Sequence, residues 1–297
     1  MTYSIVARDA ETGELGVAVQ SHWFSVGPVV PWAAPGVGAV ATQANIDVSY
    51  GPRLLEQLAR GATASEALQA LTAADPAAAT RQVAVVDARG GVAAHTGTEC
   101  IAHAGHVTAE HVSCQANIMA KRTVWDAMLV SFCATAGHLS TRLLAALDAA
   151  EAEGGDLRGR QSAALLVVPP AGEFWKTTVS LRVEDHRQPL VELRRLLALD
   201  GAYKLAGAAD ELLGQRRYAD AAQLYEQAFQ LAPDNDELLF WAGLGAVDAG
   251  QLTEGLARVC HAIELNPCWE QLLPRLTATV SPAASVVLAH LRKDAAG

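Results

Sequence analysis

The sequence predicts a mixed α+β domain over residues 1–187, followed by an all-α module over residues 188–297. In the first part, short runs rich in β-branched residues and bounded by glycine are grouped around pairs of helical segments. In the second part, no run is typical of a strand, and a pattern of small and large residues repeats with a period of 34. The length of 297 residues also fits two domains.

Strands are expected where short apolar runs lie between turn residues. The runs are residues 4–7, 15–21, 37–44, 82–87, 92–96, 112–119, 163–168 and 178–183. Short glycine-containing turns at residues 12–14 and 89–91 join two pairs of these runs, which are therefore expected to be antiparallel hairpins.

Helical spacing of apolar residues occurs in two pairs of segments. They are residues 52–61 with 63–74, and residues 124–136 with 141–153. Thr63 and Glu66 have the spacing of a capping box, which predicts a helix start, and Pro76 predicts its end. Antiparallel strands with helices grouped between them predict packed layers rather than a doubly wound sheet.

The repeat in the second part resembles the tetratricopeptide repeat. Its first copy has Tyr218, Ala222, Tyr225, Ala228, Leu231 and Pro233, and its second has Leu252, Leu256, Val259, Ala262, Leu265 and Pro267. Gly255 stands where that family usually has alanine, and Ala209 where it has glycine. Because about three units are needed to bury the faces of such repeats, residues 189–199 and 281–292 are expected to be capping helices. The resemblance implies contact with a protein partner, or packing within the protein or its own oligomer.

Charge and composition exclude several classes of function. The net charge of −10, with no basic run, disfavours nucleic acid as a partner. No apolar run approaches the ~20 residues that a membrane span needs, and the N-terminus does not read as a signal peptide. The five cysteines lack the spacing of a disulfide framework, so we expect reduced thiols and a cytoplasmic location.

Thr2 is the candidate nucleophile. Initiator methionine is normally removed before a residue as small as threonine, and Thr2 then carries a free α-amine beside its own hydroxyl. The pKa of an N-terminal amine is about 8, so the amine can accept the hydroxyl proton, directly or through a water. Many proteins begin with Met-Thr, and the residue type alone leaves a purely structural role open.

Seven blocks of the first domain resemble one bacterial family. They are residues 2–9, 13–21, 29–32, 36–43, 95–97, 115–117 and 154–164. They are similar to the domain of unknown function numbered 1028, whose fold resembles that of the N-terminal-nucleophile (Ntn) hydrolases. The resemblance implies a four-layer αββα sandwich, in which hydrolysis of amide bonds is the usual activity. It also implies a homo-oligomer and no cofactor.

Three amide side chains are candidates to assist Thr2. Asn117 stands at the end of a predicted strand, and Gln43 and Asn45 follow another. An amide N–H can stabilise the oxyanion that forms when a carbonyl is attacked, and Gln43 and Asn45 can also bind substrate. Each amide can instead cap a turn.

The glycine-rich loop at residues 154–160 carries Asp156, Arg158 and Arg160. The fork of an arginine matches a carboxylate, so one of these arginines is expected to hold an acidic substrate. Asp156 is expected to orient the substrate or the amine of Thr2. The alternative is a solvated loop with surface ion pairs.

Three further candidates stand at predicted strand ends. Ser21 and His22 are expected beside the nucleophile as hydrogen-bond partners, and His95 has a side chain suited to general-base catalysis at neutral pH. A Ser–His or Cys–His triad is a rival mechanism, but the sequence has no Gly-x-Ser-x-Gly elbow.

A metal site is another alternative. Residues able to bind zinc cluster at Cys100, His103, His106, His111 and Cys114. Their spacing matches no common zinc module and is also typical of a loop and a strand edge, so we expect no metal.

The sequence therefore predicts an amidohydrolase in which Thr2 attacks a small amide or lactam and forms an acyl-enzyme. The alternative is a non-catalytic binding or scaffold protein that presents the repeat module to a protein partner.

Overall fold

The computed structural model describes residues 2–215 and 217–294. The chain divides into two compact units, residues 1–195 and 196–297. The first unit is mixed α+β with antiparallel sheets and the second is helical, which confirms the predicted class of each part. Among the described residues, no helix combines the length and the apolar character that crossing a bilayer requires.

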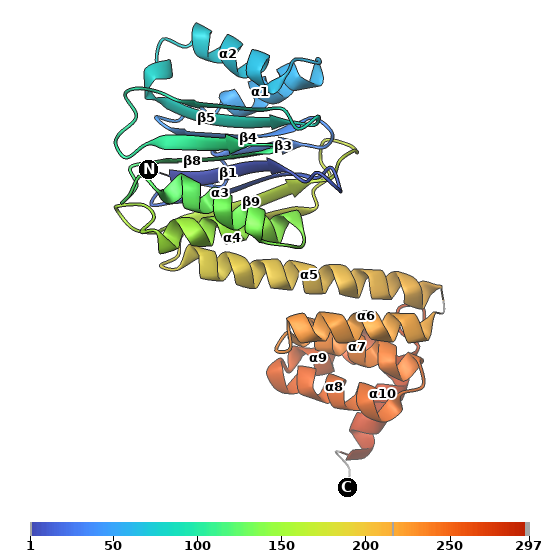
Figure 1. Cartoon of the computed structure of the whole chain (residues 1–297). Coiled ribbons are helices and arrows are strands. Elements are labelled where there is room, and N and C mark those ends of the chain that lie inside the picture. Colours follow the sequence, from blue (N-terminus) through green and yellow to red (C-terminus); the bar gives the residue numbers. More distant parts are fainter. Residues whose placement is uncertain (1, 216, 295–297) are drawn as a thin grey trace. The chain divides into compact units, whose positions relative to one another are not determined.

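Two antiparallel sheets lie at the centre of the first unit (Figure 1). The six-stranded sheet has the order β10-β9-β2-β1-β8-β7, and the four-stranded sheet has the order β3-β4-β5-β6. The strands of the larger sheet are β1 (Thr2–Arg8), β2 (Leu15–Ser21), β7 (Gly105–Ala109), β8 (Val112–Asn117), β9 (Ser162–Val168) and β10 (Val179–Val183). Those of the smaller sheet are β3 (Pro31–Ala34), β4 (Gly38–Ala44), β5 (Arg81–Asp87) and β6 (Val92–Thr96).

A pair of helices covers the outer face of each sheet (Figure 1). The helices are α1 (Tyr50–Ala59), α2 (Ala64–Ala74), α3 (Val124–Ala134) and α4 (Leu139–Ala152), with a short 3-10 turn η1 (Ala78–Thr80) after α2. Helices α1 and α2 bury apolar side chains against β4 and β5, while α3 and α4 pack on the six-stranded sheet. Both sheets are therefore buried on two faces.

The inner faces of the two sheets meet in an apolar core. Val6 and Val17 from the larger sheet pack with Ala41 and Ala84 from the smaller one. Where β1 begins, at Thr2, the inward-facing side chains are polar instead. The core therefore holds the sheets together at one end and leaves a polar region at the other.

Two edge strands were not predicted. β3 begins with Pro31 and includes two alanines, and β7 contains Gly105 and two exposed polar positions. Neither sequence has a strong strand propensity, and each strand pairs with one neighbour only. Their conformation is thus set by the neighbouring β4 and β8 rather than by local sequence.

The second unit is built from α-helices. They are the C-terminal part of α5 (Pro189–Gly214), α6 (Tyr218–Leu231), α7 (Asp236–Asp248), α8 (Leu252–Leu265), α9 (Cys268–Leu272), the 3-10 turn η2 (Leu273–Arg275) and α10 (Ala283–Asp294). The segment expected to be a short helix at residues 189–199 continues to Gly214, and the one expected at 281–292 is α10.

Helices α7 and α8 approach each other closely at two glycines. A Cβ atom on Gly255 would lie 2.6 Å from the carbonyl oxygen of Gly243 and 2.5 Å from Cγ2 of Val247. A Cβ atom on Gly243 would likewise meet the carbonyl oxygen of Gly255 at 2.9 Å. Glycine at position 255, where the repeat family usually has alanine, therefore permits backbone contact between the helices.

The capping box predicted at α2 is confirmed. The Thr63 hydroxyl accepts from the backbone N–H of Glu66 at 3.2 Å, and the Glu66 carboxylate accepts from the backbone N–H of Thr63 at 2.9 Å. We expect Thr63→Ala to lower the free energy of unfolding by about 1 kcal/mol, because the backbone N–H of Glu66 at the helix start loses its acceptor. Urea unfolding with hydrogen exchange of the first turn measures this. Ser65→Ala, at an exposed position of the same helix, is the control, and an equal effect of both variants would contradict the capping role.

Candidate functional site

Thr2 lies at the start of β1 and is 5% exposed. It pairs with Ser21 on β2 and with Asn117 on β8, so the ends of three strands meet around it. Its Oγ1 lies 3.1 Å from the hydroxyl oxygen of Ser21. Alternation along β1 places Thr2, like Val6, on the face that meets the second sheet. The hydroxyl of Thr2 therefore faces the space between the sheets.

Two side-chain amides hold the backbone of Thr2. Gln43 Nε2 donates to the Thr2 carbonyl oxygen at 3.3 Å, and Asn117 Nδ2 donates to the same oxygen at 3.4 Å. Both amides also donate to Gln82 Oε1, at 2.7 and 2.9 Å. The Asn117 N–H groups are thus used within the protein. In the structure, Gln43 and Asn117 both bond to the backbone carbonyl oxygen of Thr2.

Gln82 on β5 is the centre of this buried network. Its Nε2 donates to the Thr96 hydroxyl and to the carbonyl oxygens of Gly105 and Ala116, at 2.9, 3.0 and 2.9 Å. It is fully buried and links strands of both sheets. Its oxygen accepts from both amides that hold Thr2, so it fixes which way those amides point.

The network continues along β1 and β8. The Ser4 hydroxyl donates to Gln43 Oε1 at 2.7 Å and accepts from Gln115 Nε2 at 2.6 Å. Ser4, Gln82 and Gln115 are not among the residues predicted for the site. The signal was their position, because each is a polar residue inside a run that predicts a strand, and all three are fully buried.

The residues that follow the two amides have left-handed backbones. The φ angle is +68° at Ala44 and +57° at Ile118. This conformation is uncommon for residues other than glycine, costs about 1–3 kcal/mol, and is least favourable for a β-branched side chain. The two strained residues thus flank Thr2 directly after Gln43 and Asn117, and strain of this kind gathers at functional sites.

Asp156 lies next to the residues that follow β2 and β8. His22 comes directly after β2 and Ile118 directly after β8, and the last residues of these strands pair with Thr2. Asp156 Oδ2 accepts from the backbone N–H of His22 at 3.1 Å, and the N–H of Leu157 donates to the carbonyl oxygen of Ile118 at 3.2 Å. The loop that carries Asp156 is therefore tied to both strands that flank the start of β1.

Both loop arginines are engaged with carboxylates of the protein. Arg158 Nη2 lies 3.1 Å from Asp156 Oδ2, and Arg160 Nε lies 2.5 Å from Glu151 Oε1. The His22 ring approaches the carbonyl oxygen of Arg160 at 3.3 Å and points along the loop. The structure thus gives both guanidinium groups internal partners, which does not favour the expected capture of an acidic substrate.

Tyr3 connects β1 to helix α4 on the other face of the sheet. Its hydroxyl donates to Glu151 Oε2 at 2.6 Å and also contacts the Gln20 amide. Burial raises the pKa of Tyr3 well above its usual value, and the nearby Glu151 carboxylate raises it further. Arg160, Glu151 and Tyr3 therefore form a chain of contacts behind Thr2.

The tyrosines are expected to ionise at higher pH in the folded protein than in the unfolded protein. Burial is the main cause that raises the pKa of Tyr50 to about 12 and the pKa of Tyr3 and Tyr225 well above the usual value. In the folded state the pKa of each of these tyrosines exceeds the unfolded value of about 10. The stability that the neutral tyrosines contribute is therefore complete below about pH 10 and is lost as the pH rises above it. At about pH 11, tyrosinate absorbance of the native protein should be well below that of urea-unfolded protein. Equal absorbance would contradict these buried environments.

His95 lies away from Thr2. It pairs with Val83, which packs against α1 and α2, so its side chain is on the outer face of the four-stranded sheet. Its Nε2 lies 2.8 Å from the carbonyl oxygen of Ala78 in η1. The structure does not bring His95 together with the candidate nucleophile.

The cysteines and histidines of residues 100–114 are also dispersed. His106 Nδ1 bonds to the Thr96 hydroxyl at 2.8 Å, while Cys114 is fully buried on the face of β8 opposite Asn117. Among the residues described by the structure, no three His, Cys, Asp or Glu side chains are grouped in a way that could hold a metal ion.

Two cavities open at the Thr2 end of the sheets, and Ala44 lines both. The smaller has a volume of about 80 Å³; its lining residues are Thr2, Trp23, Val26, Val29, Val30, Gln43, Ala44 and Ile46. The larger has a volume of about 300 Å³; its lining residues are Ala44, Asn45, Thr80, Glu99, Cys100, Ile101, Asn117 and Ile118. Asn45 donates to the Thr80 hydroxyl at 3.0 Å, and both residues line the larger cavity. Within these two linings, no residue of the described loop 154–160 takes part.

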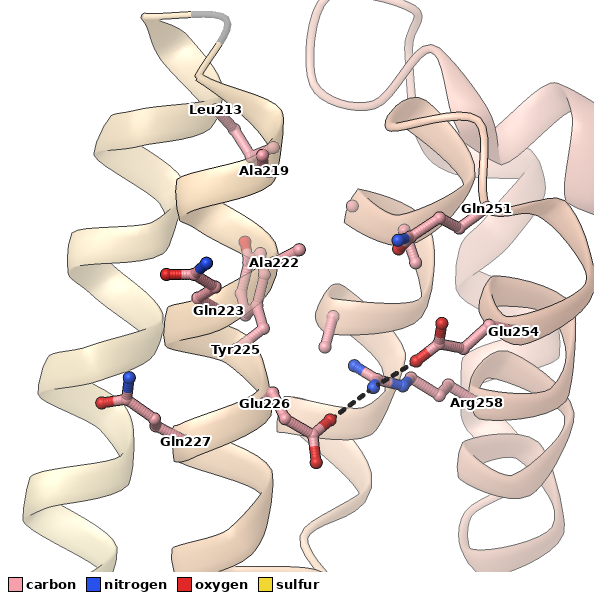
Figure 2. A pocket seen from close by; sticks show the side chains of 13 residues that line it. Leu213, Ala219, Ala222, Gln223, Tyr225, Glu226, Gln227, Gln251, Glu254 and Arg258 are labelled. Atoms are coloured by element: carbon pink, nitrogen blue, oxygen red, sulfur yellow. Dashed lines mark hydrogen bonds and ion pairs between the residues drawn. The ribbon is translucent and has the colours of Figure 1, made fainter.

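The helical unit has a groove of its own, with a volume of about 520 Å³. Figure 2 shows Gln223 and Gln227 of α6 and Gln251, directly before α8, along its walls. Arg258 reaches towards Glu226 and Glu254. Arg258 Nη2 lies 2.8 Å from Glu226 Oε2 and 2.6 Å from Glu254 Oε1. The first of these ion pairs connects α6 to α8 across the groove, and the second lies within α8.

The chain belongs to the Family of unknown function (DUF1028), whose family model matches residues 2–193. Among solved structures, it is similar to the crystal structure of protein SPO2555 from Silicibacter pomeroyi, also of DUF1028. That match has 34% identity and a TM-score of 0.60, and it covers 66% of this chain and 87% of the other. Anbu (ancestral beta-subunit) from Yersinia bercovieri matches with 11% identity and a TM-score of 0.34. That match covers 66% of this chain and 92% of the other. No curated protein matches.

Proposed function

We propose that the first unit is an amide hydrolase of the Ntn type, in which Thr2 attacks a small amide or lactam. The observation that carries the proposal is the position of the Thr2 hydroxyl, which lines a cavity between two sheets while two buried amides hold its backbone. The order of layers, with a helix pair outside each of two antiparallel sheets, supports the four-layer αββα arrangement of that class.

The chemistry requires the α-amine of Thr2 to be free, after removal of Met1. That amine accepts the hydroxyl proton, and Oγ1 bonds to the acyl carbon. The C–N bond breaks as the proton passes to the leaving nitrogen. Water then hydrolyses the ester and regenerates the hydroxyl.

The neighbouring residues have positioning roles in this mechanism. Gln43 and Asn117 fix the Thr2 backbone, and the Ser21 hydroxyl, 3.1 Å from Oγ1, orients the nucleophile. Asp156 lies beside the start of β1, where its carboxylate can orient the free amine.

Covalent labelling tests the proposal. Intact-mass analysis first identifies the fraction of chains that begin at Thr2, and p-nitrophenyl acetate then serves as an activated acyl donor. We expect one acetyl group on Thr2 in the wild type, retained labelling in Thr2→Ser, and none in Thr2→Val, which keeps the shape but lacks the hydroxyl. The labelling rate should rise with pH up to about 8, as the amine becomes neutral.

Thr98→Val, at an exposed threonine, is the matched control and should label like the wild type. Retention of Met1 in every chain, or equal labelling of Thr2→Val and wild type, would falsify the proposal that Thr2 is the nucleophile.

A second candidate function is binding of a protein partner by the helical unit. Helices α6 and α8 each begin and end 34 residues apart, which supports a tetratricopeptide-like repeat, and the groove of about 520 Å³ lies between them. Gln227→Trp fills the groove from an exposed position. If binding is the function, this variant should fail to restore the wild-type phenotype to a strain in which the gene is deleted. Thr2→Val should restore it, and the reverse pattern would exclude this candidate.

A further inference from the structure

We propose that the substrate is an N-acylated amine with a short branched aliphatic acyl group and an amine part that is neutral or positively charged. This inference rests on the proposed use of Thr2 as the nucleophile and specifies which amides it accepts. It is carried by the two cavities on either side of Ala44, which differ in size, in their contact with Thr2 and in charge.

The smaller cavity is suited to the acyl group. Thr2 lines it, and in an acyl-enzyme the acyl group stays bonded to Thr2 Oγ1. Its wall includes Val26 and Val30, which are 1% and 2% exposed, together with Val29. A volume of about 80 Å³ with an apolar wall accepts a few branched carbons and excludes a fused aromatic ring or a carboxylate.

Trp23 forms the solvent side of this cavity. It belongs to the lining and is 61% exposed, so it contacts both the cavity and the solvent. An apolar acyl group bound in the cavity would remove part of this apolar surface from water.

The larger cavity is suited to the amine part. Thr2 does not line it, so a group bound there can leave while the acyl group stays. Among the described residues of its lining, Glu99 is the one carboxylate, and there is no Lys, Arg or His. The nearby Arg81 is paired with Asp75 at 2.9 Å. A carboxylate on the amine part would therefore meet Glu99 without a compensating cation.

The charge of the cavity also suits the product. When Oγ1 of Thr2 bonds to the acyl carbon, the C–N bond breaks and the hydroxyl proton reaches the leaving nitrogen through the α-amine. An aliphatic amine released in this way takes a further proton from water and becomes a cation at neutral pH. The Glu99 carboxylate attracts that cation away from the acyl-enzyme and towards the open side of the cavity.

Two matched series of amides test the inference with the full-length protein, and release of the free amine is measured. The first series joins 3-methylbutanoyl to benzylamines that carry a trimethylammonium, a hydroxymethyl or a carboxylate group. We expect the carboxylate to react about five-fold or more slowly than the cation, the effect of one exposed charge near contact distance. In the second series the amine part is always the hydroxymethyl benzylamine, and the acyl group varies. The 3-methylbutanoyl amide should be cleaved about ten-fold or more faster than the acetyl amide, and the 2-naphthoyl amide should not be cleaved.

Variants assign each preference to its cavity. Glu99→Gln should abolish the preference for the cation, whereas Glu110→Gln, at an acid with an 89% exposed side chain in the β7–β8 turn, should leave it unchanged. Val29→Phe, which fills the smaller cavity from a half-buried position, should lose 3-methylbutanoyl cleavage and keep acetyl cleavage.

The outcomes separate this inference from the proposed function. If p-nitrophenyl acetate labels Thr2 but no amide of the series is cleaved, or the carboxylate or naphthoyl compounds are preferred, the substrate class is wrong and the nucleophile stands. If Glu99→Gln keeps the charge preference, the amine part does not bind at the larger cavity. If the ester gives no label that depends on Thr2, both proposals fail.

Discussion

Replacing Gln82 with leucine is expected to lower the free energy of unfolding by about 3–5 kcal/mol. Leucine removes the acceptor shared by Gln43 and Asn117 and the donor to Thr96, Gly105 and Ala116. Each buried group left without a partner costs about 1–3 kcal/mol, and part of this cost is recovered by the apolar side chain.

Urea unfolding of the full-length protein measures the effect, with hydrogen exchange of β5 and β8 to locate it. Gln69→Leu, at an exposed position of α2, is the matched control and should change stability by less than about 0.5 kcal/mol. In addition, Gln82→Leu should slow acylation of Thr2, because Gln43 and Asn117 lose the partner that orients them. A loss of less than about 1 kcal/mol would show that the network contributes little to the fold.

Gly255→Ala is expected to destabilise the helical unit by about 2 kcal/mol, although alanine is the better helix former and the usual residue of the repeat family. The added Cβ would lie 2.6 Å from the Gly243 carbonyl oxygen. A backbone atom cannot move aside as a flexible side chain does, so α7 and α8 must separate. This separation outweighs the gain of about 1 kcal/mol in helix propensity.

Gly207→Ala is the matched control, because a Cβ at that position in α5 would meet no atom within 4 Å. It should stabilise the protein by up to about 1 kcal/mol. Thermal unfolding gives the two changes, and hydrogen exchange in α7 and α8 should increase in Gly255→Ala only. We expect the changes in stability of the two variants to have opposite signs. Equal stabilisation by both would mean that α7 and α8 are not in close backbone contact at Gly255.

Local signals in the sequence predicted local structure well. The two hairpins β1–β2 and β5–β6 and the capping box of α2 depend on neighbouring residues, and all are confirmed. Strands β3 and β7 were missed because their propensity is weak and their pairing partners decide their conformation. Tertiary pairing of that kind leaves little trace within a few residues of sequence.

The candidate site was predicted in part. The ends of β1, β2, β4 and β8 do bring Thr2, Ser21, Gln43 and Asn117 together. Gln82 was missed because a polar residue in a strand usually faces water, and only the second sheet shows that this position is buried. His95 was expected at the site but lies on the outer face of its sheet. Because side chains alternate along a strand, its neighbour Thr96 faces the site instead.

The polar end of the space between the sheets has a geometric consequence. Apolar faces can slip past one another at little cost, because the hydrophobic effect is not directional. The hydrogen bonds of Gln43, Gln82 and Asn117 join one sheet to the other, and a hydrogen bond weakens steeply when its distance or angle changes. A slip of the sheets would break several of these bonds at once. The network therefore fixes the alignment of the two sheets relative to each other. It thereby also fixes the shape of the cavities that open at Thr2.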